Sequence, residues 1–411
     1  MQWITESKAH RVVYWLMGVG LFLQLSSKVL YTSDSTNGVH VYLLLILPAL
    51  LLTVWSFLKK ESLFLVEAKR FLVAAGLFMT VCSVSAYWSD SGQSVLYVLR
   101  KSLVIFLYLA AIIYLVTVAK WQHIKFFIMM LCVVAAVGAL VSLCYQLVVL
   151  DESFGWRTFR IYRMGHGEWI DLGYPVIAGI YFALFGVLAA SLVALGHQNH
   201  SQNLVLMLVI LVLLPYVFLT FSRTSWIAWA VAICYLMVVF RHRATIALAT
   251  ILACIAFVMI AIYQNEMAVE VTERQLSGRP QIWLWTLQHF LEHPLLGHGF
   301  AHSFWPEKPY AHAHNFFLQV LFEHGILGLT CYLFMLTSVF AGVWRYRRNK
   351  LVLAAFALVI YILTAMMVDV QHVITRPGLF WSIFWFPLAF TIGAVNRAQL
   401  AAPINTLSED Y

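Results

Sequence analysis

Charged side chains are scarce in this sequence, and their scarcity excludes most soluble classes of protein. Only 11% of the 411 residues are charged, whereas 62% are hydrophobic. A soluble globular domain is about a quarter charged and about half apolar. The composition therefore excludes a soluble enzyme, a nucleic-acid-binding protein and a disordered chain, and it predicts a polytopic membrane protein. The net charge of +8 indicates basic cytoplasmic loops and not a nucleic-acid partner.

Cysteine pairs and the usual metal-binding motifs are also missing. All six cysteines fall inside apolar runs, and the sequence contains neither CxxC nor HExxH. Small buried hydrophobic residues explain these cysteines, so we expect no disulfide framework and no zinc site. The first apolar run is not followed by a small-residue cleavage site, so we expect an uncleaved first span.

Long apolar runs are what the sequence has in abundance, and they predict an all-α fold. A helix needs about 20 apolar residues to cross a bilayer. We expect one membrane domain over residues 1–411 with about twelve transmembrane helices. Polar residues at 221–225 and 240–244 separate three of the runs. The predicted spans are 12–30, 40–58, 71–88, 96–118, 124–148, 174–195, 203–221, 225–240, 244–263, 316–343, 351–370 and 379–396.

The distribution of basic residues predicts the orientation in the membrane. With the N-terminus inside, the inner loops carry most of the Lys and Arg, whereas three short outer loops carry only Arg376 between them. An even number of spans then places both termini in the cytoplasm. Two longer segments, 149–173 and 264–315, face outward and are rich in Trp, Phe and Leu. Long loops are commonly functional, so we expect the site on this outer side.

The larger outer segment contains a predicted helix that starts near Arg279. Ser277 is a suitable N-cap, Pro280 suits the first turn, and the helix should end near Glu292, before Pro294. This helix is too short to cross the membrane, so we expect it to lie at the outer interface. An arginine at a helix N-terminus can bind phosphate. A contact with lipid headgroups explains Arg279 equally well.

Histidines concentrate near the end of the same segment. Seven of the fifteen lie between 289 and 324, and His312 and His314 form an HxH pattern. No acidic or cysteine ligand stands at a familiar zinc spacing, so we expect no metal. His314 is a candidate general base because imidazole accepts a proton near neutral pH. The alternative is an interfacial histidine bonded to the backbone.

Basic residues on the outer side go against the charge rule and need an explanation. Together they can line a cavity for an anion, and a pyrophosphate suits them because arginine pairs bidentately with phosphate oxygens. Contacts with lipid headgroups and structural ion pairs are the alternative. These residues are Arg100, Lys101, Arg157, Arg160, Arg163, Arg223, Arg274 and Arg279.

Two acidic residues lie in the late spans. Asp369 is near the outer end of its span, and an acid inside a membrane is a functional-site candidate by default. We expect Arg223, Arg279 or His314 to be its partner. Glu323 lies nine residues after His314 in the same predicted helix, where we expect it to fix packing.

Three segments resemble the O-antigen ligase and polymerase family. They are SRTSW around Arg223, GRPQIWLWTLQHFLEHPLLGHGF around Arg279, and HNFFLQVLFEHGILG around His314. Their order matches as well, with an arginine at a span end, a long outer loop that opens with an arginine, and a His–Asn pair that leads into a Glu-x-Gly span. The resemblance covers roughly residues 205–370.

This resemblance implies an inverting glycosyltransferase of the GT-C type at the outer face of the bacterial inner membrane. It implies transfer of a glycan from undecaprenyl pyrophosphate to a sugar of lipid A–core, with neither a metal nor a nucleotide sugar. The family's essential residues fall on Arg223, Arg279 and His314, and a late acid falls on Asp369. The candidates for binding the substrate pyrophosphate are His312, Asn315 and the remaining outer basic residues.

Two other functions stay open. An O-antigen polymerase uses the same lipid-linked donor, but polymerases diverge more around the His–Asn segment and often have two comparable outer loops. A flippase for lipid-linked glycans would bind substrate phosphate with the same arginines and leave His314 without a catalytic role. A flippase pathway needs polar groups through both leaflets, whereas here they gather on the outer side. We therefore favour the ligase.

Overall fold

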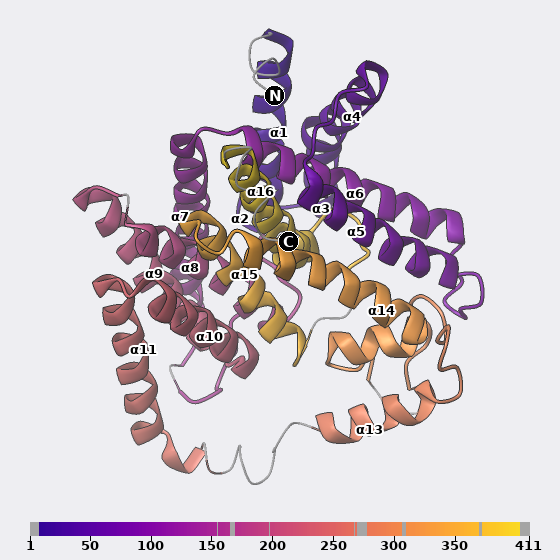
Figure 1. Ribbon diagram of the computed structural model, residues 1–411. Helices are drawn as coiled ribbons and strands as arrows, with labels where there is room; N and C mark the ends of the chain where they lie inside the picture. The colour runs from indigo at the N-terminus through magenta and orange to yellow at the C-terminus, as the bar shows by residue number, and fades with distance from the viewer. Residues whose placement is uncertain are drawn as a thin grey trace.

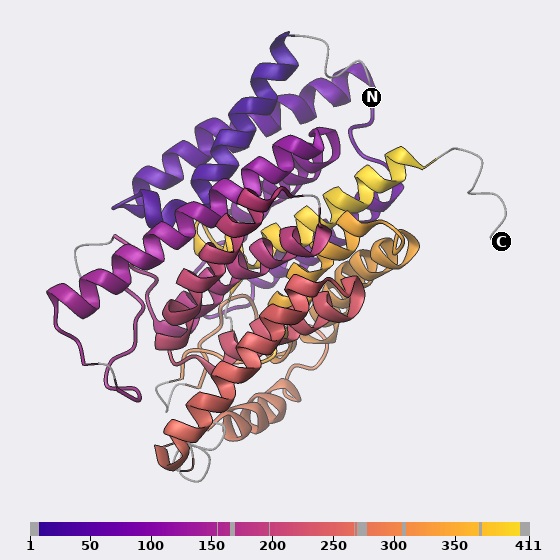
Figure 2. The same cartoon turned by 90° about the vertical axis from the view of Figure 1, so that its left-hand side faces the viewer.

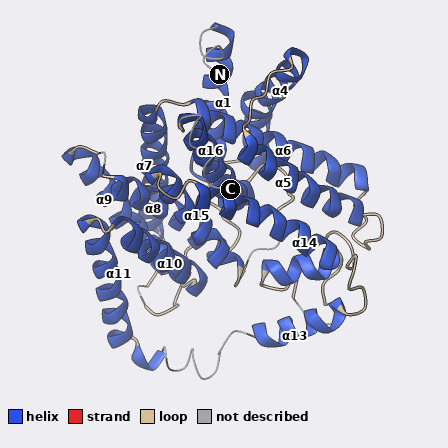
Figure 3. Cartoon of the chain, viewed as in Figure 1, coloured by secondary structure: helices blue, strands red, loops and turns tan. Residues whose placement is uncertain are grey.

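Helices make up all the regular secondary structure in the part of the chain that the structure describes (Figure 3). This computed structural model describes residues 8–153, 155–164, 169–196, 198–266, 268, 278–305, 310–369 and 372–402. The predicted all-α class is confirmed. In the view of Figure 2 most of the long helices run along a similar direction, as in a bundle.

Every predicted span coincides with a helix or with adjoining helical segments. The first half of the chain forms α1 (Lys8–Leu25), α2 (Ser27–Leu30), α3 (Asp34–Val41), η2 (Tyr42–Ile46), α4 (Leu47–Lys59), α5 (Val66–Ser85), α6 (Val95–Val118), α7 (Trp121–Cys144), η3 (Tyr145–Val149) and α8 (Pro175–Leu195). The second half forms α9 (His200–Leu219), α10 (Arg223–Phe240), α11 (Arg243–Ile262), α13 (Arg279–Phe290), α14 (Phe316–Arg345), α15 (Lys350–Met366), η4 (Trp381–Trp385) and α16 (Phe386–Ala401). The segments η2, η3 and η4 are π-helical turns within longer helical runs.

Among the described residues, eight helices are long and apolar enough to cross a membrane. The chain is therefore a multi-pass membrane protein. Helix α15 is apolar but has only 17 residues, so it falls below that length. The expected total of about twelve spans, counted at about 20 residues each, and the GT-C type of the fold stay predictions.

Side-chain caps determine where the helices near the outer segments begin. The Ser222 hydroxyl accepts a hydrogen bond from the Ser225 N–H (3.3 Å), and Asn315 Oδ1 accepts one from the Leu318 N–H (3.2 Å). Such bonds satisfy N–H groups that have no partner inside the helix. They leave Arg223 in the first turn of α10 and His314 directly before α14. The predicted separation of α9 from α10 is confirmed.

Helix α13 confirms the short helix predicted in the large outer segment. It begins at Arg279 with Pro280 in its first turn and ends at Phe290. The N-cap is Gly278, whose backbone is left-handed with a φ of 73°. Ser277, the predicted N-cap, lies outside the described residues. Helix α13 packs against α14 (Figure 1).

Two of the helices that lead to the candidate site residues, α10 and α15, pack against α8. Nearly every residue of α8 is buried, and it contacts α7, α9, α10 and α15. Helix α10 also packs along α15, and α14 packs along α5. This packing brings the start of α10 and the end of α15 to one region of the bundle.

Helix α14 is kinked at Gly325, where the backbone has a φ of 63° and a ψ of −163°. The kink leaves N–H and carbonyl groups without helical partners, and residues 294–299 supply them. The His298 and Gly299 N–H groups donate to the carbonyls of Phe322 and Glu323 (2.9 and 2.8 Å). On the other side of the kink, the Ile326 N–H donates to the Pro294 carbonyl (2.9 Å). We call residues 294–299 the strap.

Candidate functional site

His314 lies in a strained backbone conformation directly before α14. Its φ is 48°, in the left-handed region that residues other than glycine rarely adopt. The strain is held by a local hydrogen bond, because the His314 N–H donates to His312 Nδ1 (3.2 Å). The two imidazole rings lie 4.0 Å apart between centroids. Strain of this kind commonly accompanies functional sites, so the geometry agrees with a functional His314.

Asp369 faces both histidines. Its carboxylate oxygen Oδ1 lies 3.6 Å from His314 Nδ1 and 3.9 Å from His312 Nε2. Asp369 is 2% exposed, while the side chain of His314 is 30% exposed. The prediction that His314 is a partner of Asp369 is confirmed. A carboxylate beside Nδ1 favours the proton on that nitrogen and leaves Nε2 free to accept another.

Asn315 connects the same loop to the end of α15. Besides capping α14, its side-chain amide donates to the Met367 carbonyl (3.1 Å). Met367 precedes Asp369 by two residues, so this bond helps to bring the carboxylate to the histidines. The contacts of Asn315 are structural, and its predicted role in binding substrate stays a prediction.

His312 is neutral at ordinary pH. Burial lowers the pKa of His312 to about 3, and repulsion from His314 adds to this, although Asp369 opposes it. Because Nδ1 accepts the His314 N–H, the proton of the neutral ring is on Nε2, which faces Asp369. His312 is therefore suited to supporting His314 and not to exchanging protons itself.

These three residues also match a cation site by ligand type. One ligand atom each from His312, His314 and Asp369 lies within 4.8 Å of the others. Two imidazoles and a carboxylate form a common zinc ligand set. This set was not foreseen from the sequence because Asp369 lies more than fifty residues after the histidines. Metal independence therefore requires a direct measurement.

Arg279 and Arg223 come to the same centre from two helices. Burial lowers the pKa of the Arg279 guanidinium, Asp369 partly opposes this, and the Arg223 cation adds to it. All three charges are therefore within electrostatic range. Arg279 Nε is buried and has no hydrogen-bond partner among the described residues. A buried guanidinium nitrogen with a free proton is suited to an anionic ligand.

The other predicted basic residues have varied surroundings. Arg160 donates to the carbonyls of Thr220 and Phe221 (2.9 and 3.4 Å), so it stabilises the C-terminal end of α9 next to Arg223. Arg157 has a left-handed φ of 56°. Arg163 is exposed, and its guanidinium lies 5.2 Å from the Tyr162 ring centroid. Arg274 lies outside the described residues.

At the start of α6 the two basic residues also differ. Arg100 is exposed. Lys101 donates to Gln93 Oε1 (3.2 Å), and its ammonium lies 4.2 Å from the Tyr97 ring centroid. It is also in electrostatic range of His372. The proposed pyrophosphate contacts of Arg100, Lys101, Arg157, Arg160, Arg163 and Arg274 stay predictions.

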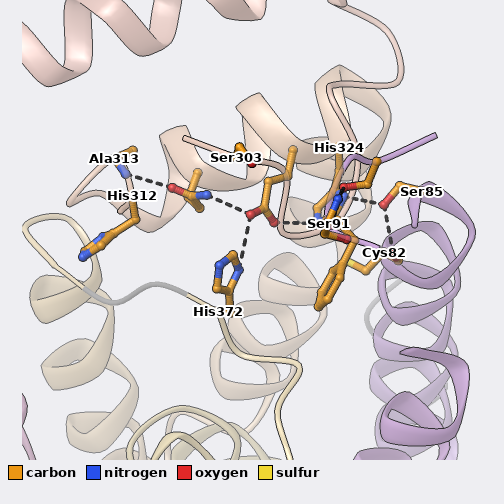
Figure 4. Close-up of polar contacts among 12 residues, drawn as sticks. Cys82, Ser85, Ser91, Ser303, His312, Ala313, His324 and His372 are labelled. Atoms are coloured by element: carbon orange, nitrogen blue, oxygen red, sulfur yellow. Dashed lines mark hydrogen bonds and ion pairs between the residues drawn. The ribbon is translucent and has the colours of Figure 1, made fainter. Parts of the chain in front are cut away.

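Residues that the sequence analysis overlooked surround this centre. Gln319, His324 and the partly exposed His372 form a polar network with the buried Glu323 (Figure 4). Tyr174, which has a buried hydroxyl, is in electrostatic range of Asp369. The one available signal was the Glu–His–Gly sequence at 323–325, where a glycine inside an apolar helix suggests a kink.

Comparison with known proteins agrees with the motifs. Residues 204–333 match the family described as O-antigen ligase. This segment includes Arg223, Arg279 and His314 and ends before Asp369. The chain is 27% identical to an O-antigen ligase of Pseudomonas aeruginosa over 401 residues, which cover 95% of this chain and 93% of the relative. The resemblance to the O-antigen ligase family is therefore confirmed, by the family match over residues 204–333 and by the similarity of most of the chain to this relative.

Proposed function

We propose that this chain transfers an O-antigen glycan from undecaprenyl pyrophosphate to a sugar hydroxyl of lipid A–core. The reaction takes place at the outer face of the bacterial inner membrane, with both termini in the cytoplasm. The observation that carries the proposal is the contact between His314 and Asp369 within electrostatic range of Arg279. The similarity to O-antigen ligases supports the choice of donor and acceptor.

The reaction is a single displacement. The acceptor hydroxyl oxygen attacks the anomeric carbon, and the new C–O bond forms as the bond from that carbon to the pyrophosphate oxygen breaks. His314 Nε2 takes the hydroxyl proton, while Asp369 beside Nδ1 stabilises the imidazolium that results. The pyrophosphate leaves with the electron pair, and the anomeric centre is inverted.

Arg223 and Arg279 stabilise the negative charge that develops on the departing pyrophosphate. Fixed cations aimed at developing charge are an effective way to lower a barrier. The unpaired Nε of Arg279 provides a donor that no described residue uses. These cations replace the divalent metal that other enzymes use for such leaving groups.

A metal at His312, His314 and Asp369 would give a different mechanism. A cation bound through His314 Nδ1 would force the ring proton onto Nε2, so His314 could not accept the proton of the acceptor. General-base and metal-bound roles of His314 are therefore mutually exclusive.

The test uses purified protein in detergent with a lipid-pyrophosphate-linked glycan, lipid A–core and EDTA. We expect a gel shift of the core in EDTA, and loss of this shift in His314→Ala. Restoration of activity by zinc alone would support the metal mechanism instead. Lengthening of the lipid-linked glycan without a shift of the core would identify a polymerase. Binding of the donor with neither product would favour a flippase.

A further inference from the structure

Glu323 is a buried carboxylate that lies between the two loops of the site. It is 3% exposed and belongs to α14, directly before the Gly325 kink. One loop, residues 311–315, carries His312 and His314. The other, which follows α15, carries Asp369. Burying a carboxylate is costly unless hydrogen bonds and ion pairs compensate, and Glu323 finds both in these two loops.

The first connection runs through Gln319 to the histidine loop. Gln319 Nε2 donates to Glu323 Oε1 (2.8 Å), and Gln319 Oε1 accepts the N–H of Ala313 (2.8 Å). Ala313 lies between His312 and His314 and is fully buried. Figure 4 shows this chain of bonds from Ala313 toward the centre of the network. The backbone between the two histidines is thus fixed to α14.

The second connection runs through His372 to the loop of Asp369. His372 Nδ1 lies 3.3 Å from Glu323 Oε1, the oxygen that Gln319 also contacts. Burial lowers the pKa of His372, but the Glu323 carboxylate outweighs this effect, so the pKa lies above its usual value. His372 follows Asp369 by three residues. One carboxylate oxygen therefore contacts the anchors of both loops.

The remaining contacts of Glu323 hold it in place. His324 Nε2 lies 3.4 Å from Glu323 Oε2, and His324 Nδ1 is bonded to the Ser85 hydroxyl of α5 (2.9 Å). The strap bonds to the Glu323 carbonyl through Gly299. Glu323 is thus attached to α5, to the strap and to α14 itself, which gives it little freedom to move.

We propose that Glu323 is a positioning residue that sets the distance between His314 and Asp369 by holding both of their loops. We call the links from Glu323 to the two loops the clamp. The proposal rests on the proposed function, because His314 and Asp369 are the proton-accepting pair of that reaction. Glu323 does not touch the reacting atoms. Loss of the clamp lowers the rate of the chemical step and leaves binding of the donor by Arg223 and Arg279 intact.

The test compares four variants in the transfer assay. Glu323→Gln removes the charge that attracts His372, and Gln319→Glu places two carboxylates side by side. Each should lower kcat about tenfold to a hundredfold, the range expected when a catalytic group is displaced by about 1 Å, with the KM of the donor within about twofold. The combined swap, Gln319→Glu with Glu323→Gln, should be faster than the worse single variant, because the new carboxylate accepts from both Ala313 and the new amide, but it still lacks the charge beside His372.

Glu67→Gln is the matched control. Glu67 is also buried (2% exposed), is paired with Arg345 at the opposite end of α14, and should tolerate the change with kcat within about twofold. Hydrogen exchange gives a readout that does not depend on activity. In Glu323→Gln we expect residues 311–318 and 366–376 to exchange faster than in the unmodified protein. In Glu67→Gln we expect their exchange to be unchanged.

Two outcomes would overturn the clamp: a folded Glu323→Gln with the kcat and exchange of the unmodified protein, or a swap variant no better than the worse single variant. If the unmodified protein transfers no glycan but the exchange of both loops rises as expected, the proposed function fails and the attachment of the two loops to Glu323 stands.

Discussion

At the residue scale, the pair formed by His314 and Asp369 makes the sharpest prediction. His314→Ala should lower kcat about a hundredfold to ten-thousandfold, the usual contribution of a general base. Asp369→Asn should lower kcat as well, because an amide no longer stabilises the imidazolium. The double variant should be no slower than His314→Ala alone, since groups that act as a unit are not additive. The measurement is the rate of glycan transfer to lipid A–core for each variant at a saturating concentration of the donor.

His200→Ala provides a control for these variants. His200 is exposed in the first turn of α9, so its removal should leave the rate unchanged. An Asp369→Asn variant that keeps the full rate would show that the 3.6 Å contact with His314 has no catalytic role.

The pair of His372 and Glu323 predicts a pH-dependent contribution to stability. The pKa of His372 is raised in the folded protein, so folding takes up a proton there and the stabilisation is complete below the unfolded pKa of about 6.5. It disappears as pH rises through the folded pKa. The difference in Tm between the unmodified protein and His372→Asn should therefore be largest near pH 6 and shrink at higher pH.

Comparing two variants in the same detergent removes the effects of the other histidines, which both proteins share. The titratable groups in electrostatic range of His372 include Glu323, Lys101, His312 and His324. A Tm difference that stays constant from about pH 5.5 to 8.5 would mean that the pair is not ionised in the folded protein.

At the element scale, the kink in α14 depends on a glycine. Gly325 has a left-handed φ of 63°, and a Cβ there would overlap the backbone of Leu295 in the strap. Gly325→Ala should therefore lose the strap bonds and the position of Glu323 together, which lowers both Tm and yield. Gly18→Ala in α1 is the control, because a Cβ there meets nothing within 4 Å and alanine favours a helix by about 1 kcal/mol. Size-exclusion profiles and thermal unfolding measure both variants. A Gly325→Ala protein with the yield and Tm of Gly18→Ala would contradict the prediction.

The sequence predicted the elements well and their connections less well, for a physical reason. Apolar runs reveal helices because burial in lipid and helix formation depend on local composition. The start of α13 and the separation of α9 from α10 also follow from neighbouring residues. By contrast, the strap is held to α14 by backbone bonds between residues that lie 24 or 32 positions apart in the chain, and no local pattern encodes such a pairing.

The site residues also fall into a group that the sequence predicted and a group that it did not. His314, Arg223 and Arg279 were predicted because each stands in a recognisable segment, and Asp369 because acids are rare inside membranes. Gln319 and His372 were missed because their role comes only from a shared contact with Glu323. Glu323 was expected to fix packing, and its contacts are an ionic and hydrogen-bonded network with Gln319, His324 and His372.

At the scale of the whole molecule, α14 joins two polar regions through an apolar interior. Near one end, Glu323 contacts His324 and His372. At the other end, Arg345 forms an ion pair with Glu67 (2.7 Å), and three further basic residues follow within five positions. Basic residues mark the cytoplasmic side. The site and this basic end should therefore lie on opposite sides of the membrane.

Cysteine labelling in intact cells tests this orientation. Ala311 and Arg347 are exposed and flank α14. In a cysteine-free background, a maleimide that cannot cross the inner membrane should label Ala311→Cys and leave Arg347→Cys unlabelled until the cells are opened. This follows because α14 has 30 residues, or about 45 Å at 1.5 Å per residue, which exceeds the hydrocarbon thickness of about 30 Å even with a kink. Labelling of both positions from outside would mean that α14 does not cross. Labelling of Arg347→Cys alone would reverse the orientation and place His314 in the cytoplasm, where a periplasmic transfer to lipid A–core is impossible.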